Sequence, residues 1–278
     1  MIRLSTKRRR LSDAALLRHL FMQLICRYEL LIRRILFTRK IKSKTMKSIN
    51  KAARLAGILY IVMDIFMIFS GMFVDSKLIV SGDAAATISN IMASEWLFRL
   101  GFVSYQIGWI LQLLLVIALY RLFKKVDKGQ SRLMVILVVV FVSVAFLNTL
   151  NQFVPILLFS GAESISAFDP TQLQTLAGFY LDMYEHGIMI NELFWGLWLI
   201  PLGVLVYKSG FVPKVFGVLL FIGCLGHLIT YFSTFLFPDY TSILMPIGEM
   251  AMFGELPIFL WLLIKGVKEQ IPIEQYRN

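Results

Sequence analysis

Six long apolar runs constrain this chain more than any other feature of its 278 residues. Each is long enough to cross about 30 Å of hydrocarbon as a helix, which takes roughly 20 residues. None of the runs alternates polar and apolar residues, so they favour helices over the strands of a membrane β-barrel. We expect an all-α, polytopic membrane protein with six transmembrane helices. The predicted spans lie near residues 55–74, 100–120, 133–159, 188–207, 215–237 and 243–264.

The composition agrees with a chain embedded in lipid. Hydrophobic residues make up 58% of the sequence and charged residues only 16%. A typical soluble domain carries about 25% charged residues. A disordered chain is also excluded, because this sequence has ample apolar surface to bury.

The net charge of +11 is concentrated near the start of the chain. Residues 1–54 hold 16 of the 28 Lys and Arg residues and only two acids, Asp13 and Glu29. A basic segment attached to an apolar body favours the membrane surface, with anionic lipid as its partner. No aromatic platform or docking motif for nucleic acid accompanies it. We therefore expect membrane lipids, and not nucleic acid, as partners.

The distribution of Lys and Arg between the spans predicts the orientation. The two tails and the loops 121–132 and 208–214 together hold 26 of these residues, whereas the opposite side holds Lys77 and Arg99. Cytoplasmic loops of membrane proteins carry an excess of Lys and Arg. Both termini are therefore expected in the cytoplasm of a protein of the cell membrane.

The chain divides into a basic tail (1–50), a six-helix domain (51–268) and a short cytoplasmic segment (269–278). Apolar residues in 16–36 recur at three- and four-residue steps, but arginines interrupt them. This pattern predicts an interfacial helix and not a span. An alternative start at Met46 would remove that helix, because the sequence after Met46 opens directly onto the first span.

Two loops on the side opposite the tails carry signals for the start of a helix. Asp83 precedes three alanines, and Asp169 precedes Pro170. Asp is favoured as an N-cap, and Pro is favoured at the first helical position. In the second loop an apolar stripe leads to Gly187, which we expect to end the helix. Both segments are predicted to be amphipathic helices on the outer membrane face.

Three ionisable residues are predicted to share one layer near the middle of the membrane. Counted at about 1.5 Å per helical residue, Asp64, His227 and Glu255 fall at similar depths. An ionisable residue at this depth costs roughly 2.5–3.5 kcal/mol on insertion scales, so each needs a role. Pro257 removes a helical hydrogen bond from the carbonyl of Phe253, which favours a polar niche beside Glu255. The niche is interpreted either as a proton or cation site or as a polar network that holds three helices in register.

A second set of polar residues is predicted nearer the outer face. Asn148, Asn151 and Gln152 share one side of the third span. One interpretation is an outward-opening cavity for a small polar or cationic ligand, and the alternative is hydrogen bonding between helices. The set is completed by Asn191, Glu192 and Glu249.

Enzyme signatures are missing from the sequence. It contains no His-Glu-x-x-His zinc motif, no phosphate-binding loop and no Gly-x-Ser-x-Gly elbow. His186 and His227 fall at different predicted depths, and Cys26 and Cys224 fall on different sides of the hydrophobic boundary. We therefore expect no metal site, no disulfide and no cofactor.

These observations favour a small-solute or ion-coupled transport role over catalysis. One alternative is a lipid-modifying enzyme of the outer leaflet, with Glu192, Glu249 or His186 as acid or base. The other is a non-catalytic accessory protein that binds lipid or a partner, in which case the polar residues within the spans are structural.

Short motifs at the borders of the spans are specific enough to indicate a family. They are ARLAGILY (53–60), GDAAAT (82–87), EWLFRLG (95–101), FDPTQLQ (168–174), YKSGFVP (207–213) and GVLL (217–220). Together they resemble the bacterial integral membrane family named domain of unknown function 4386, over about residues 50–268. The resemblance implies a multi-pass protein of the bacterial plasma membrane, with no reaction or ligand assigned.

Overall fold

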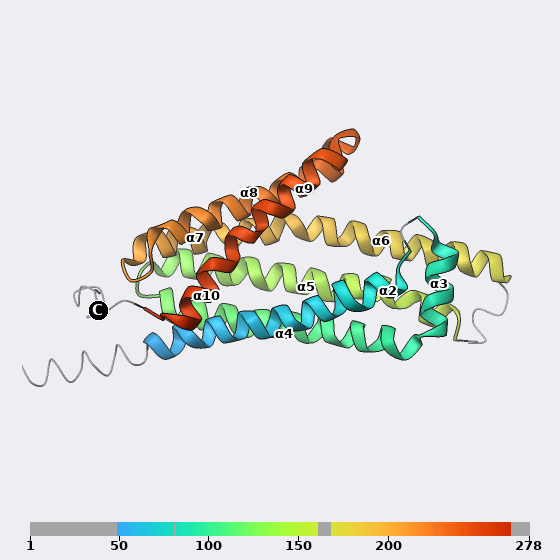
Figure 1. The fold of residues 1–278 in the computed structure, drawn as a ribbon, viewed down its shortest axis with the longest axis horizontal. Coiled ribbons are helices and arrows are strands. Elements are labelled where there is room, and N and C mark those ends of the chain that lie inside the picture. Colours follow the sequence, from blue (N-terminus) through green and yellow to red (C-terminus); the bar gives the residue numbers. More distant parts are fainter. Residues whose placement is uncertain (1–48, 81, 161–167, 268–278) are drawn as a thin grey trace, which may run out of the picture. The chain divides into compact units, whose positions relative to one another are not determined.

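The structure is a computed structural model that describes residues 49–80, 82–160 and 168–267 (Figure 1). Within this part of the chain, six helical segments are long and apolar enough to cross a membrane, which confirms the predicted class and number of spans. The tail with its predicted interfacial helix, the alternative start at Met46 and the last eleven residues lie outside the described residues. Spans 1 to 6 are Ile49–Leu78, Glu95–Phe123, Lys128–Leu158, Pro170–Ser209, Lys214–Leu236 and Pro238–Ile264.

Contacts between successive spans form a closed ring. The helices that pack in sequence are α4 (Glu95–Phe123), α5 (Lys128–Leu158), α6 (Pro170–Leu197), α8 (Lys214–Leu236) and α9 (Thr241–Met252). Span 1 joins this series because η1 (Phe69–Asp75) packs against α4.

The ring closes where span 6 returns to span 1. The rings of Tyr60 on span 1 and Phe259 on α10 (Leu256–Ile264) are stacked, with centroids 3.8 Å apart. One turn earlier, Gly57 lies directly against the backbone of Leu263. Figure 1 shows these two segments side by side, span 1 in blue and α10 in red. The six spans therefore surround a common interior.

The α-helix is interrupted in three of the spans. In span 1 the helix changes to the π-helix η1. Span 4 breaks at Trp198, between α6 and α7 (Leu199–Ser209), because Pro201 has no amide hydrogen to continue the helical bonding. In span 6 the 3-10 helix η4 (Phe253–Glu255) separates α9 from α10. This 3-10 turn lies beside Pro257, and the Phe253 carbonyl, which was expected to lose its helical hydrogen bond, accepts one from the backbone N–H of Leu256.

The predicted helix starts in the two long loops are confirmed. Asp83 caps α3 (Ala84–Ala93) by accepting a hydrogen bond of 2.8 Å from the backbone N–H of Ala86. Asp169 and Gln172 form a capping box at the start of α6, with Pro170 at the first helical position. Each cap satisfies backbone N–H groups that the helix itself leaves without partners.

The prediction that Gly187 ends a separate helix is wrong, because α6 continues through it to Leu197. Gly187 faces Asn148 of α5, and a side chain at Gly187 would overlap the Asn148 amide. That amide donates a hydrogen bond of 2.8 Å to the carbonyl of Tyr184. The missing side chain therefore permits a close crossing of α5 and α6, as small residues do in membrane helix pairs.

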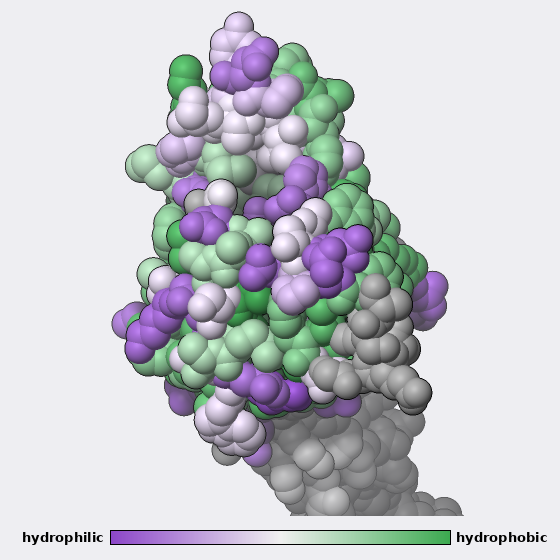
Figure 2. Space-filling model, turned by 90° about the vertical axis from the view of Figure 1, so that its right-hand side faces the viewer, coloured by the Kyte–Doolittle hydropathy of each residue, from purple (hydrophilic) through white to green (hydrophobic). Residues whose placement is uncertain are grey.

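The two ends of the ring differ in charge. At the end where the described chain starts and finishes, Lys and Arg gather around residues 121–132 and 208–214. The opposite end, which we call the far end, carries Lys77 and Arg99. Figure 2 looks onto this far end, where the tip that α8, η3 (Pro238–Tyr240) and α9 form stands above the rest of the surface.

Asp127 joins two spans at the basic end. It caps α5 by accepting a hydrogen bond of 3.0 Å from the backbone N–H of Gln130, and it forms an ion pair of 3.1 Å with Lys208 of α7. The pKa of Asp127 lies below its ordinary value. The hydrogen bond from the Gln130 N–H contributes most to this lowering, and the ammonium of Lys208 contributes next.

We expect Gly187→Ala to destabilise the protein by about 1–3 kcal/mol, the usual range for forced overpacking. The cause is the overlap with the Asn148 amide. The thermal unfolding midpoint of the detergent-solubilised protein measures the effect. Gly71→Ala is the matched control, because a side chain there meets nothing within 4 Å. Equal midpoints for the two variants would contradict the close crossing.

We expect Asp127→Ala to lower the unfolding midpoint at pH 7, since loss of an N-cap typically costs about 1 kcal/mol. The folded protein lowers the pKa of Asp127, so its stabilising contribution persists down to about pH 4 and disappears only as the pH falls through the lowered pKa. The wild type and Asp127→Ala should therefore converge only in stronger acid. Asp127→Asn, which retains the cap, should lie between them at pH 7. A constant difference at every pH would contradict this assignment.

Candidate functional site

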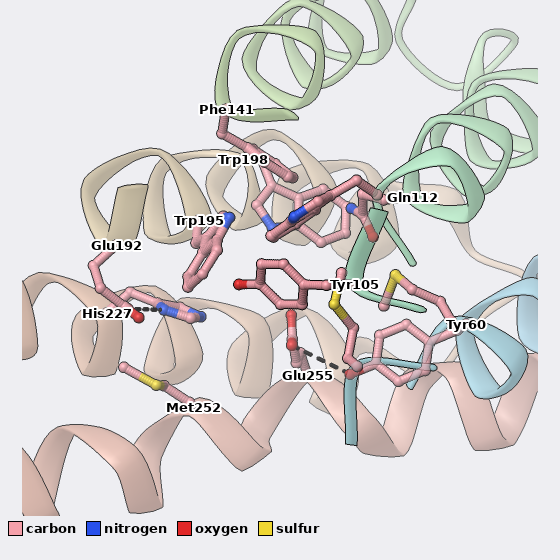
Figure 3. A pocket seen from close by; sticks show the side chains of 13 residues that line it. Tyr60, Tyr105, Gln112, Phe141, Glu192, Trp195, Trp198, His227, Met252 and Glu255 are labelled. Carbon is pink, nitrogen blue, oxygen red and sulfur yellow. Dashed lines mark hydrogen bonds and ion pairs between the residues drawn. The ribbon is translucent and has the colours of Figure 1, made fainter. Parts of the chain in front are cut away.

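A cavity of about 320 Å³ lies inside the ring, and all six spans contribute to its wall (Figure 3). Its lining combines aromatic rings, methionines and a few polar groups, and it contains no Lys or Arg. The lining residues are Tyr60, Met63, Met67, Tyr105, Trp109, Gln112, Phe141, Glu192, Trp195, Trp198, His227, Met252 and Glu255.

A buried hydrogen bond joins Glu192 of α6 to His227 of α8. The Glu192 Oε2 and His227 Nδ1 atoms are 2.6 Å apart, and both side chains are less than a tenth exposed. Figure 3 shows the other ring nitrogen of His227 pointing away from Glu192, toward the side of the cavity that holds Glu255. The pair thus presents an imidazole nitrogen to the cavity (Figure 3).

Local packing fixes the position of the His227 ring. Gly196, one turn after Glu192 on α6, lies against the Cβ atom of His227, so the two helices approach closely at this level. The edge of the Trp195 ring meets the imidazole, with centroids 6.3 Å apart. Such contacts hold a side chain in one orientation and prepare it for a ligand.

Glu255 occupies the wall opposite this pair, where span 6 is interrupted. Its Oε1 accepts a hydrogen bond of 3.2 Å from the Tyr60 hydroxyl, and the stacking of Tyr60 on Phe259 holds that phenol in place. The neighbouring Gly254 lies against the carbonyl of Leu219 on α8, which brings η4 close to span 5.

The structure brings together the three ionisable residues that were predicted to share a layer. Glu255 lies within electrostatic range of His227 and Glu192, and Asp64 lies within range of Glu255. Asp64 stands one turn after Tyr60 and does not line the cavity. Glu192, which the sequence analysis placed in the outer set, joins this cluster through His227.

One wall of the cavity is almost entirely aromatic. The rings of Trp109 and Trp195 are stacked with centroids 5.5 Å apart, and Phe141 meets Trp109 edge to face at 6.0 Å. The indole nitrogens of Trp109 and Trp195 are buried, and neither has a hydrogen-bond partner among the described residues. Buried donors without a partner are rare in folded proteins.

Tyr105 connects the cavity with polar groups nearer the far end. Its hydroxyl forms a hydrogen bond with that of Tyr184 on α6, and Asp75 at the end of η1 lies within electrostatic range of both. Sequence reasoning missed Asp75, because it falls between a predicted span and its loop. It also missed the tryptophans, which count only as apolar residues in a hydropathy pattern.

The four amides of the predicted outer set do not line the cavity, and two of them, Asn148 and Asn191, bond to a neighbouring helix. Asn148 bonds to Tyr184, and Asn151 donates to the Asn148 amide oxygen at 3.1 Å. Asn191 donates to the carbonyl of Phe141 at 3.2 Å. Gln152 is buried on α5, and its Oε1 has no partner within the described chain. Asn148 and Asn191 thus bond helices together, whereas Asn151 bonds within α5.

The remaining acid–base candidates of the enzyme alternative are dispersed. Glu249 is exposed on α9, and His186 is exposed with its Nδ1 bound to the carbonyl of Asp182. Glu192 is instead buried against His227. Across residues 49–80, 82–160 and 168–267, no group of three or more His, Cys, Asp or Glu side chains is arranged to hold a metal ion. Cys224 is buried and free.

Comparison with known proteins places the cavity within a recognised domain. A family model described as "Domain of unknown function (DUF4386)" matches residues 55–266, a stretch that includes every lining residue. An uncharacterized protein of Archaeoglobus fulgidus is 31% identical over 161 residues, which cover 57% of this chain and 79% of that protein. No solved structure matches the chain.

The Glu192–His227 contact predicts strong coupling between the two side chains. Glu192→Gln and His227→Gln should each destabilise the protein, since leaving a buried hydrogen-bonding group without its partner costs about 1–3 kcal/mol. The double variant should lose less than the sum, with a coupling energy of about 0.5–3 kcal/mol. Denaturant unfolding in detergent measures the stability of the wild type, the two single variants and the double variant, which together form a double-mutant cycle. Glu249→Gln, combined with Glu192→Gln, should be additive. Additivity of the Glu192 and His227 variants would show that the pair does not form.

Proposed function

The chain belongs to the family described as Domain of unknown function (DUF4386), and on that premise we propose that its cavity binds a small solute within the membrane and transports it, coupled to proton exchange. The proposal goes beyond the membrane-embedded architecture. The observation that carries it is an acid-lined cavity to which all six spans of a lipid-facing ring contribute side chains.

An open cavity distinguishes this proposal from a purely structural polar network. Residues that only hold helices in register would bond directly to a neighbouring helix, as Asn148 of α5 does to the carbonyl of Tyr184 on α6. Glu192, His227 and Glu255 instead border about 320 Å³ of space. Ionisable groups are costly inside a membrane and commonly mark ion and substrate pathways there. The geometry therefore favours a binding role for this cluster.

The two sides of the cavity give a simple basis for proton coupling. His227 and Glu192 together can hold or release one proton, which changes the charge of the cavity by one unit. A cation that binds near Glu255 repels a proton on His227, so binding favours release of that proton. By thermodynamic linkage, protonation of His227 then favours release of the cation.

The interruptions in the spans support a moving structure around the site. Trp198, at the break in span 4, and Glu255, at the break in span 6, both line the cavity. Discontinuous helices with binding sites at their breaks are a recurring feature of secondary transporters. Such breaks let the halves of a span move separately, which alternating access requires.

The proposal includes an orientation in the cell membrane. Lys and Arg gather at the end of the ring where the described chain starts and finishes. By the positive-inside tendency, that end faces the cytoplasm and both termini are cytoplasmic. The basic tail, residues 1–50, is then expected on the side where anionic lipid is a suitable partner.

Purified protein in liposomes that enclose a pH-sensitive dye tests the transport proposal. We expect that at least one solute from a panel of small cations, zwitterions and neutral polyols causes proton movement. Glu255→Gln and Asp64→Asn should reduce that rate at least tenfold, about 1.4 kcal/mol in the barrier. Glu249→Gln, an exposed acid on α9, is the matched control and should retain the rate. Folded wild type that responds to no solute, or acid variants that match wild type, would overturn the proposal.

A further inference from the structure

The chemistry of the wall identifies a class of solute, an inference that rests on the proposed function. We propose that the cavity binds a small organic cation, an alkylated ammonium that also carries an oxygen acceptor. Three independent features of the wall carry this: its charge, its aromatic faces and its unpartnered indole N–H groups.

The charge of the cavity suits a cation. Glu192 and Glu255 line it, Asp64 lies within electrostatic range, and no Lys or Arg is among the lining residues. Glu192 is already hydrogen-bonded to His227. In the part of the chain that the structure describes, Glu255 has only the neutral hydroxyl of Tyr60 as a hydrogen-bond partner and no ion pair with a basic side chain. A cation would supply the missing counter-charge.

The aromatic wall favours an organic cation over a bare metal ion. Phe141, Trp195 and Trp198 lie across the cavity from Glu255 (Figure 3). Trp109 extends this wall by stacking on Trp195. Aromatic faces attract alkylated ammonium groups by cation–π interaction, and tryptophan does so best. Small metal cations instead need several oxygen ligands close together. Glu255 facing tryptophans therefore suits a bulky, weakly hydrated cation.

The unpartnered indoles add a second requirement for the solute. Trp109 is only 5% exposed, and both its Nε1 and that of Trp195 are buried without an acceptor among the described residues. A hydroxyl or carbonyl oxygen on the solute would accept from one of them. A solute with an ammonium group at one end and an oxygen at the other meets both requirements.

The remaining wall permits some variation in the size of the cation. Met63, Met67 and Met252 line the cavity from spans 1 and 6. Methionine is unbranched and flexible, so it adapts to ligands of different shape. We therefore expect a preference for a class of cations and not for one compound.

Equilibrium binding of radiolabelled choline to the full-length protein in detergent tests the inference. Choline carries a quaternary ammonium and a hydroxyl, and 3,3-dimethylbutan-1-ol has the same shape without the charge. We expect saturable choline binding, and a competition by the neutral alcohol that is at least tenfold weaker than that by unlabelled choline. Glu255→Gln and Trp195→Leu should each weaken choline binding at least tenfold. Glu249→Gln, outside the cavity, should leave it unchanged.

Trp195→Phe provides a milder test if Glu255→Gln or Trp195→Leu fails to fold. It retains an aromatic face and should therefore bind choline more tightly than Trp195→Leu, within a few-fold of wild type. Each variant is first checked for a wild-type elution profile in size-exclusion chromatography.

The possible outcomes separate this inference from the proposed function. Equal competition by the neutral alcohol overturns the cation class but leaves a solute-binding cavity. An absence of choline binding by folded wild type also overturns the cation class, and the liposome panel then tests transport by itself. Choline binding without movement into liposomes supports the cation site and counts against transport.

Discussion

The high cost of placing polar groups in hydrocarbon is the constraint on which the rest of this structure depends. The ring of six spans satisfies it by turning Glu192, His227 and Glu255 inward. Apolar side chains such as Ile65, Leu147 and Phe253 face outward, where lipid is the natural neighbour. Polar groups that are not at the cavity, such as the Asn148 and Asn191 amides, bond across helices and satisfy backbone carbonyls.

The same constraint explains where the helices can be irregular. In lipid, backbone groups without helical partners are tolerated only where protein or an internal cavity surrounds them. The breaks at Trp198 and at η4 lie beside the cavity. Pro201 and Pro257 occur at these breaks, and each lacks the N–H that a continuous helix would use. The irregular backbone and the polar cavity are therefore two aspects of one arrangement.

The sequence predicted the six spans because hydropathy is a local property that does not depend on neighbours. It also predicted both helix caps, since an N-cap needs only the residue and the turn after it. Gly187 could not be assigned correctly from sequence alone. A glycine that ends a helix and one that admits a neighbouring helix look identical until the partner, Asn148, is known.

The candidate site was only partly predictable for a related reason. Depth along a helix can be counted, which grouped Asp64, His227 and Glu255. Rotation about the helix axis cannot be counted, so the pairing of Glu192 with His227 was missed. The aromatic wall was missed because its four side chains come from different helices. They lie on α4, on α5, on α6 and at Trp198 between α6 and α7, and only the folded arrangement of the six spans brings them together.

A thiol-accessibility measurement tests the central claim, a polar cavity inside the membrane, most directly. Single cysteines are introduced at Met252, which lines the cavity, and at Ile247, an exposed apolar residue of the same helix α9. The background lacks Cys26 and Cys224. A charged, membrane-impermeant thiol reagent should modify Met252→Cys in proteoliposomes and leave Ile247→Cys unmodified, because only the cavity admits water. Two equally unreactive cysteines would contradict the account.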